Sequence, residues 1–239
     1  AGKPVSMGTY DLSANDVVNF TMIGCRMDSI CDTTRWGVIG ANFCKNILLE
    51  NCTLSRMDTH QGVSGTYTIC GSTLGHAGLN AIGRGTLTVE NSTLNGRSLI
   101  SLRGDYGSTW EGAIVIRNSR WIPACGAPVQ PYLLSASNDG QHDFGYPCFM
   151  PREIIIDGLV IDDRQHPKDY AGPYLFTDPD GTSSTATRPF PYRLTERVSL
   201  RNLTTTSGQE PRLSPDPAFA ASVRVIEMNS AEMNAAPSP

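Results

Sequence analysis

The chain of 239 residues repeats a short apolar phrase seven times. Each copy ends in a residue of the Asn, Gly or Asp type, which we take as the marker of the repeat. The markers are Gly24, Asn51, Gly71, Asn91, Asn118, Asp157 and Asn202. Strand-like units that recur every 20 to 45 residues predict a solenoid, in which each unit is one coil and buries its apolar face only by stacking. Because a solenoid stacks equivalent residues in columns, the sequence also predicts which side chains share a surface.

Apolar residues alternate in the segments that precede the markers. This spacing of two, with many β-branched residues, predicts strands that turn one face inward. The alternating residues are Ile47, Leu49, Tyr67, Ile69, Leu87, Val89, Ile114, Ile116, Val198 and Leu200. Asn and Gly at the marker tolerate the left-handed backbone of a tight turn, and we expect the Asn side chains to bond one another from coil to coil. Leu54, Leu74, Leu94 and Trp121 are expected to continue the inward face after the turn.

The position after the marker is occupied by small side chains in five coils. These residues are Cys25, Cys52, Ser72, Ser92 and Ser119. We expect them to stack in a tight column rather than to act as redox centres. The seven cysteines include no metal-ligand pair such as C-x-x-C. Cys125 and Cys148 bracket an insertion, and the sequence leaves open whether they form a disulfide or are two unrelated thiols.

A second strand is expected in each coil after the turn. The segments that we align are residues 35–39, 60–64, 76–80 and 97–101. In this alignment Val38, Val63, Leu79 and Ile100 form an inward column. A coil of 20 residues has no room for both strands and a helix of ordinary length. This excludes repeats of the strand–helix type and predicts a parallel β-helix, with coils about 4.8 Å apart.

Coils of this length, Asn-rich turns, stacked aliphatic residues and long loops on one side resemble the right-handed parallel β-helix of the pectate-lyase-like superfamily. The resemblance is one of fold and implies an all-β solenoid of about seven coils. The resemblance covers residues 16–205. From the sequence itself we expect one domain at 1–228, with insertion loops at 122–151 and 177–193 and a frayed tail at 229–239. The catalytic pattern of the polygalacturonases is absent, and Gly75-His76-Ala77-Gly78 matches its G-H-G element only loosely.

Four cationic or titratable side chains share one position of the second-strand alignment, namely Arg35, His60, His76 and Arg97. Each lies an odd number of positions before the inward residue of its segment. Because side chains alternate along a strand, the four are expected to point outward, one coil apart. Like charges stacked in this way repel one another. The column is therefore unfavourable unless carboxylates or an anionic ligand neutralise its charge. The neighbours expected around it are Arg56, Asp58, Asn80, Arg103, Asp105 and Tyr106. We therefore predict a groove for an acidic polysaccharide along this edge.

The predicted chemistry is that of a polysaccharide lyase, which cleaves a uronate-containing glycan by β-elimination. The reaction needs a group that neutralises the carboxylate, a base for the C5 proton and an acid for the leaving oxygen. His60 or His76 is the candidate base, since histidine titrates near neutrality. Arg97 or Arg103 is the candidate neutralising group, and Tyr106 is the candidate acid. In this scheme His76→Ala abolishes turnover and leaves the fold cooperative.

Other residues are expected to contact the substrate without taking part in the reaction. Trp110 would form an aromatic platform beside the groove, and His142 lies in the polar insertion 138–146. Arg35, Arg56, Asp58 and Asn80 are assigned to substrate binding as well. No cofactor is required by the pattern. Asp139 and Asp143 offer ligands for calcium, which takes six or more oxygens.

Two other functions and a purely structural interpretation stay open. A glycoside hydrolase on the same scaffold would use two carboxylates, for which Asp58 and Asp105 are the obvious pair. A non-catalytic glycan-binding or tail-spike-like module would use the groove without turnover. Structurally, the histidines could form a stack, Arg56 and Asp58 an ion pair that closes a turn, and Trp110 a cap on the core.

Charge and hydropathy exclude some partners. The net charge is −4, which gives no electrostatic reason to expect a nucleic acid. No apolar run approaches the roughly 20 residues of a membrane span. We expect an extracytoplasmic or secreted protein whose partner is a polysaccharide. Its oligomeric state, and whether it is a segment of a longer chain, stay open.

Overall fold

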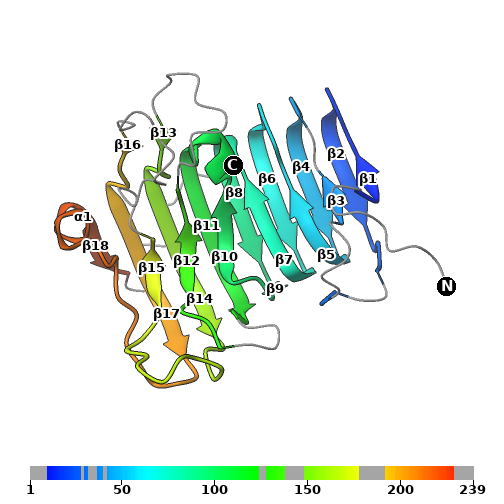
Figure 1. Ribbon diagram of the computed structural model, residues 1–239. Coiled ribbons are helices and arrows are strands. Elements are labelled where there is room, and N and C mark those ends of the chain that lie inside the picture. The colour runs from blue at the N-terminus through cyan, green and yellow to red at the C-terminus, as the bar shows by residue number, and fades with distance from the viewer. Residues whose placement is uncertain are drawn as a thin grey trace.

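The structure is a computed structural model, which describes residues 10–27, 30–31, 37–39, 42–123, 128–137, 148–177 and 192–228. Within these residues the chain forms 18 strands, one short 3-10 helix (Gly104–Tyr106) and one short α-helix, α1 (Pro217–Ser222) (Figure 1). The strands are β1 (Leu12–Ser13), β2 (Val18–Ile23), β3 (Val38–Ile39), β4 (Lys45–Glu50), β5 (Thr53–Asp58), β6 (Ser64–Cys70), β7 (Thr73–Ala81), β8 (Gly83–Glu90), β9 (Thr93–Leu94), β10 (Ser98–Leu102), β11 (Trp110–Trp121), β12 (Tyr132–Ser135), β13 (Cys148–Phe149), β14 (Glu153–Ile161), β15 (Tyr174–Phe176), β16 (Tyr192–Arg193), β17 (Arg197–Thr205) and β18 (Arg224–Glu227). No helix in this part of the chain is long and apolar enough to cross a membrane.

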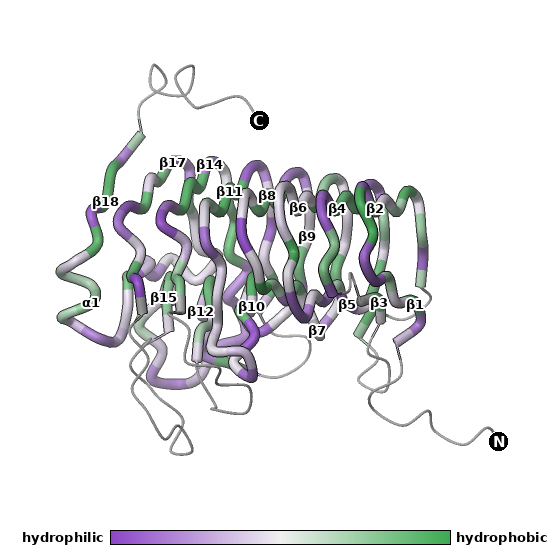
Figure 2. The backbone as a smooth tube through the Cα atoms, turned by 90° about the horizontal axis from the view of Figure 1, so that it is seen from above, coloured by the Kyte–Doolittle hydropathy of each residue, from purple (hydrophilic) through white to green (hydrophobic). Residues whose placement is uncertain are grey.

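The strands lie in two rows, and neighbours within a row are parallel. The first row is β2, β4, β6, β8, β11, β14, β17 and β18, and the second row is β1, β3, β5, β7, β10, β12 and β15. Short β9 and the end of β11 connect the rows into one 16-stranded sheet. Seen from above, successive coils lie side by side along one axis (Figure 2). The predicted all-β parallel β-helix is confirmed, with one first-row strand per coil from β2 to β17.

Columns of aliphatic side chains fill the interior. Tyr67 lies opposite Leu87 and Ile69 opposite Val89 in the neighbouring strands β6 and β8, and all four are fully buried. The other predicted inward residues before the markers are also buried, except that Leu200 in the last coil is partly exposed. The residues predicted to continue inward after the turn are all buried, namely Leu54, Leu74, Leu94 and Trp121. This continuous core explains why a single coil cannot fold alone.

At the marker, each coil from β2 to β17 places one residue in the left-handed region, directly after the strand in β2, β4, β6 and β8 and within the strand in β11, β14 and β17. These residues are Gly24, Asn51, Gly71, Asn91, Asn118, Gly158 and Asn202. The predicted markers are therefore confirmed except for Asp157, which is wrong by one residue. Gly158, with φ 85°, makes the turn because glycine takes this conformation without strain. Asp157 lies opposite Arg117 and Arg201 and forms an ion pair with Arg201, Nε to Oδ1 2.6 Å.

Serine hydroxyls, rather than Asn side chains, bond from coil to coil at the turns. The Ser72 Oγ accepts from the Cys52 amide at 3.0 Å, the Ser92 Oγ from the Ser72 amide at 3.1 Å, and the Ser119 Oγ from the Ser92 amide at 3.2 Å. No side-chain bond between Asn markers occurs among the described residues, so the expected Asn ladder is wrong. The expected column of small residues is confirmed, and its Cys25 and Cys52 are free thiols. Cys125 lies outside the described residues.

The register of the second row differs from the predicted alignment. Val38 and Leu79 both pair with Met57, so Met57 takes the inward position that the alignment assigns to Val63. Val63 lies in the following turn, opposite Gly83. The number of residues between the marker and this column changes from coil to coil, and β7 is irregular relative to β5. The repeat alone therefore cannot set this register.

One segment expected to be a loop contributes a strand to the second row. β12 lies within residues 122–151 and pairs with β10 on one side and β15 on the other. Its Leu134 lies opposite Ile100 and Phe176, and all three are fully buried. The apolar Leu133–Leu134 pair thus continues the core column through the insertion.

A buried carboxylate joins the ends of β14 and β17. Asp163 is 1% exposed and accepts hydrogen bonds from the Tyr170 hydroxyl at 2.6 Å, the Ser207 amide at 2.8 Å and the Ser207 hydroxyl at 2.6 Å. Burial alone would raise the pKa of this carboxyl group. The hydrogen bonds from Ser207 and Tyr170 outweigh burial and hold the pKa below its ordinary value.

Asp163→Asn is expected to lower the free energy of unfolding at pH 7 by about 1–3 kcal/mol, because donors buried around the carboxylate lose their charged acceptor. A depressed folded-state pKa contributes stability above the unfolded pKa, and that contribution is lost as the pH falls below it. The difference between wild type and variant should therefore shrink when urea unfolding is measured at pH 3. An equal loss at both pH values would contradict this account.

Candidate functional site

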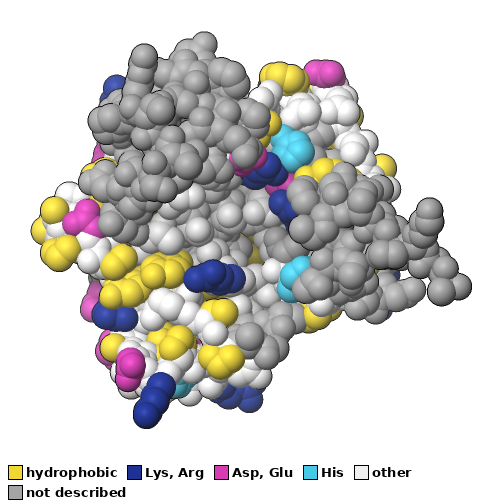
Figure 3. All heavy atoms as spheres, in the orientation of Figure 1, with side chains coloured by type: hydrophobic (Ala, Val, Ile, Leu, Met, Phe, Trp, Pro, Cys, Tyr) yellow, Lys and Arg dark blue, Asp and Glu magenta, His cyan; other side chains and the backbone are white. Residues whose placement is uncertain are grey.

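Six of the predicted site residues meet at one corner of the β-helix, together with one residue that the sequence analysis missed. We call this group the Asp58 cluster, and it consists of Tyr10, Arg56, Asp58, His60, Arg103, Asp105 and Tyr106. Asp58 ends β5, and Arg103 directly follows β10, so the two come from second-row strands on either side of β7. A mixture of histidine, basic and acidic side chains is visible at the surface in Figure 3.

Asp58 is the centre of the cluster and has no solvent-exposed surface. Its Oδ2 lies 2.6 Å from Arg56 Nη2 and 2.8 Å from Arg103 Nη1. The same oxygen accepts a hydrogen bond from the Tyr10 hydroxyl at 3.1 Å. A carboxylate without solvent needs such partners, because burying an unpaired charge is very costly. Asp58 therefore holds the two arginines in place and cannot itself contact a substrate.

The Arg103 guanidinium bonds to two carboxylates, those of Asp58 and Asp105. In addition to the contact with Asp58, its Nε donates to Asp105 Oδ1 at 2.9 Å and its Nη2 to Asp105 Oδ2. Burial acts to lower the pKa of Arg103, but the hydrogen bonds and charges of Asp105 and Asp58 outweigh it and hold the pKa above its ordinary value. The guanidinium carbon also lies 5.6 Å from the ring centre of Tyr106. This arginine is permanently charged and fixed in orientation.

His60 and Tyr10 form a hydrogen-bonded pair on the accessible side of the cluster. The Tyr10 hydroxyl lies 3.1 Å from His60 Nε2, and the same nitrogen lies 3.6 Å from Asp58 Oδ2. The His60 side chain is 22% exposed, and its ring centre lies 6.4 Å from that of Tyr106. Burial and the charge of Asp58 raise the pKa of Tyr10 to about 12. A protonated phenol therefore stands next to an imidazole that solvent can reach.

The predicted column of four cationic side chains is not formed as aligned. Because Met57, not Val63, lies beside Leu79, His60 falls beyond the end of β5 rather than beside His76. The His76 amide donates to Ile30 O at 3.0 Å. Within the described part of the chain no hydrogen bond or ion pair joins His76 or the exposed Arg97 to the Asp58 cluster. Arg35 lies outside the described residues.

Two residues that are predicted to contact the substrate, Trp110 and Asn80, are instead part of the β-helix scaffold. Trp110 has no exposed surface; its Nε1 donates to the Ala113 carbonyl at 3.1 Å and its ring packs against Tyr67. The expected sugar platform at Trp110 is therefore wrong, because an indole that caps the core offers no face to a ligand. Asn80 is 9% exposed, and its carbonyl accepts from the Thr59 amide at 3.3 Å.

The remaining predicted ligands concern metal binding and the insertion. His142, Asp139 and Asp143 lie outside the described residues. Among the residues that the structure does describe, no group of three His, Cys, Asp or Glu side chains could hold a metal ion. Calcium therefore stays a prediction that concerns the insertion alone.

Tyr10 is the functional candidate that sequence reasoning missed. It precedes β1, before the first recognisable repeat, and lies 50 residues from its partner His60. Pairing of β1 with β3 and of β3 with β5 carries it to the Asp58 cluster. The sequence signal is limited to a tyrosine that lies two second-row strands before the strand of Asp58. That signal has no meaning until the register of the second row is known.

The fold and this cluster define a parallel β-helix with a tyrosine–histidine pair supported by two arginines and two aspartates. The chain is 28% identical over 175 residues to a protein of Klebsiella phage P510 described as a capsule KL64-specific depolymerase. The similarity covers 63% of this chain and 17% of that protein, so the chain spans about a sixth of its relative's length. No family model matches the chain. No solved structure matches it either.

Proposed function

We propose that the chain binds an extracellular capsule-type polysaccharide containing a uronic acid and cleaves it by β-elimination at the Asp58 cluster. The observation that carries the proposal is the accessible pair of His60 and Tyr10, 3.1 Å apart, above a carboxylate that anchors two arginines. The capsule-specific relative supports a polysaccharide as substrate. A capsule surrounds its cell, so the chain would act outside the cell.

The chemistry requires two proton transfers at neighbouring atoms of the sugar. Because the single hydrogen of the Tyr10 hydroxyl is donated to Asp58 Oδ2, His60 Nε2 is the donor to Tyr10, and His60 accepts the C5 proton on its other ring nitrogen, Nδ1. The electron pair of the broken C5–H bond forms the C4–C5 double bond, and the bond from C4 to the glycosidic oxygen breaks. Tyr10 retains its proton at neutral pH because its pKa is about 12, and it donates that proton to the leaving oxygen. The charges of Arg56 and Arg103 stabilise the anion that develops next to the uronate carboxylate.

The alternative of hydrolysis by two carboxylates has less support from the geometry. A glycoside hydrolase needs both carboxyl groups beside the scissile bond. Asp58 has no exposed surface, and both oxygens of Asp105 are bonded to Arg103. Neither carboxyl group is placed to protonate a glycosidic oxygen. Binding without turnover differs from elimination only in the products, so an assay must separate these two functions.

The test is incubation of the purified chain with KL64 capsular polysaccharide and with a panel of acidic and neutral polysaccharides, with and without chelator. Elimination leaves a C4–C5 double bond, so ultraviolet absorbance and new reducing ends should rise together on an acidic polymer. Reducing ends without absorbance would instead identify a hydrolase. Binding with neither product would identify a glycan-binding module, and either result would contradict the proposal.

A further inference from the structure

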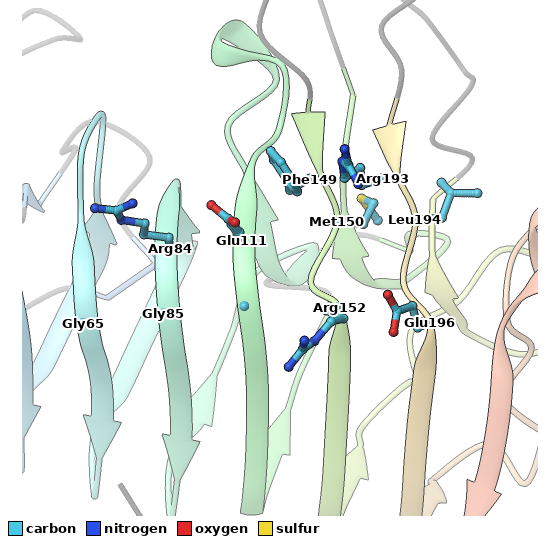
Figure 4. Close-up of a pocket in the computed structure, with 11 residues that line it drawn as sticks. Gly65, Arg84, Gly85, Glu111, Phe149, Met150, Arg152, Arg193, Leu194 and Glu196 are labelled. Atoms are coloured by element: carbon cyan, nitrogen blue, oxygen red, sulfur yellow. The ribbon is translucent and has the colours of Figure 1, made fainter.

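A groove of about 580 Å³ lies away from the Asp58 cluster, over the beginnings of the first-row strands. Its floor comes from β6, β8 and β11, and one wall comes from β13 and from the segments around β16 (Figure 4). The Asp58 cluster contributes no residue to its lining. None of the predicted site residues that the structure describes lines this groove, and the proposed reaction does not involve it.

The floor of the groove is a strip of glycines on three successive coils. Gly85 lies opposite Gly112, and the Gly65 carbonyl lies directly below Gly85. A Cβ atom at Gly85 would lie 2.0 Å from that carbonyl oxygen, and one at Gly112 would lie 2.0 Å from the Gly85 oxygen. Their φ angles of 118° and 143° also exclude other residues. The backbone geometry therefore keeps three neighbouring positions free of side chains, and a flat ligand can approach the strands closely.

Charged side chains of alternating sign stand along this strip. Arg84 of β8 lies opposite Glu111 of β11. On the next coils Arg152 precedes β14, and the Glu196 amide donates to the Arg152 carbonyl. All four side chains are exposed and line the groove (Figure 4). None of the four belongs to an ion pair with another described residue, so their donors and acceptors face solvent.

An aromatic side chain completes the wall. Phe149 of β13 is partly exposed and lines the groove together with Arg193 of β16. The Arg193 guanidinium carbon lies 5.7 Å from the Phe149 ring centre, which is within the range of a cation–π contact. In Figure 4 these two side chains and Met150 stand above the row that contains Arg152 and Glu196.

We propose that this groove is a second glycan-binding site, which holds a segment of the polysaccharide beside the segment that is cleaved. The glycine strip would accept the flat face of a sugar ring, and Phe149 would pack against its C–H surface. Arg84 and Arg152 would donate to ring hydroxyls or a carboxylate, and Glu111 would accept from neighbouring hydroxyls. This inference rests on the proposed polysaccharide substrate, and it requires no reaction in the groove.

The chain path connects the groove with the Asp58 cluster. Gly65 follows His60 by five residues, and Glu111 follows Tyr106 by five residues. The segments that carry His60 and Tyr106 of the Asp58 cluster thus lead directly into β6 and β11, two strands of the floor. A polymer that crosses this corner of the β-helix can contact both sites. Binding in the groove would then increase the affinity for long chains without changing the chemistry.

The experiment uses oligosaccharides of graded length, prepared by partial acid hydrolysis of KL64 capsular polysaccharide so that their supply does not depend on the activity of the chain. Binding is measured by calorimetry in a His60→Ala background. Arg84→Ala combined with Arg152→Ala is expected to weaken binding of the longer fragments at least about tenfold, since each substitution removes a charge-assisted hydrogen bond to the sugar. Phe149→Ala should also weaken the binding of these longer fragments. In the chain with His60 intact, these substitutions should raise KM and leave kcat unchanged.

The matched control is Arg224→Ala, because Arg224 is an exposed arginine of the first row that does not line the groove. Circular dichroism and urea unfolding confirm that each variant retains its fold. Fragment binding by the groove variants equal to that of Arg224→Ala overturns the inference, as does failure of every fragment to bind the parent chain. Loss of binding in the groove variants, without any cleavage by wild type, supports the groove and refutes only the proposed reaction.

Discussion

Replacing His60 by alanine is expected to lower kcat for polysaccharide cleavage by about 10²–10⁴-fold, the usual contribution of a positioned acid or base. His60 is partly exposed, and its Nε2 contacts the Tyr10 hydroxyl at 3.1 Å and lies 3.6 Å from Asp58 Oδ2. The arginine–aspartate contacts below it involve other side chains. The variant should therefore keep the wild-type free energy of unfolding to within about 1 kcal/mol, as is usual for a partly exposed polar side chain. Initial rates from ultraviolet absorbance, measured beside urea unfolding, check both statements.

His76→Ala is the matched control for this prediction. The sequence leaves His60 and His76 as alternatives for the base, and within the described residues only His60 contacts the Asp58 cluster. The sequence predicts that His76→Ala abolishes turnover, but no contact joins His76 to the Asp58 cluster in the described part of the chain, so we expect this variant to retain turnover. Tyr10→Phe should lose turnover to a similar degree as His60→Ala, since it removes the acid but keeps the ring. Full activity of His60→Ala, or loss of activity in His76→Ala alone, would refute the assignment.

The fold could be predicted because the constraints on one coil are local. Ile69 and Val89 must both point inward, and Asn91 must adopt a positive φ, so the sequence repeats these features at each turn. The second row lacks this regularity, because the distance from the turn to the inward column varies. The sequence alignment therefore assigns Val63 to the position beside Leu79 that Met57 occupies in the structure. The spacing of apolar residues shows that a segment forms a strand. The register of that strand depends in addition on the neighbouring strand with which it pairs.

The sequence predicts the location of the candidate site, but not the contacts that form it. The predicted column places His60 beside His76, whereas in the structure His60 contacts Asp58 and Tyr10. Asp58 and Arg103 meet because an ion pair forms across two coils, 45 residues apart in sequence. The charged residues near the ends of the second-row strands correctly indicate where the Asp58 cluster lies. Their partners could not be predicted, because they depend on side-chain directions at a corner that carries no repeat.

Asp58→Asn is expected to lower the free energy of unfolding by about 3–5 kcal/mol, which is typical when one partner of a buried ion pair is removed. The amide that replaces the carboxylate would keep the shape of the side chain but would leave Arg56 and Arg103 without the charge that they share, and Arg56 is only 14% exposed. The free energy of unfolding from urea titration at pH 7 measures the effect.

Glu153→Gln provides the comparison, because Glu153 also pairs with an arginine but at the surface, where the Arg197 side chain is 47% exposed. Such a pair contributes about 0–1 kcal/mol, so the two substitutions remove the same kind of contact and differ mainly in burial. Equal losses would mean that Asp58 contributes no more than a surface ion pair. The anchoring role would then fail, and with it the reason why the two arginines stay below His60 and Tyr10. A large loss for Asp58→Asn alone would show that the charge of the cluster is held by the scaffold before any polysaccharide arrives, as preorganised electrostatic catalysis requires.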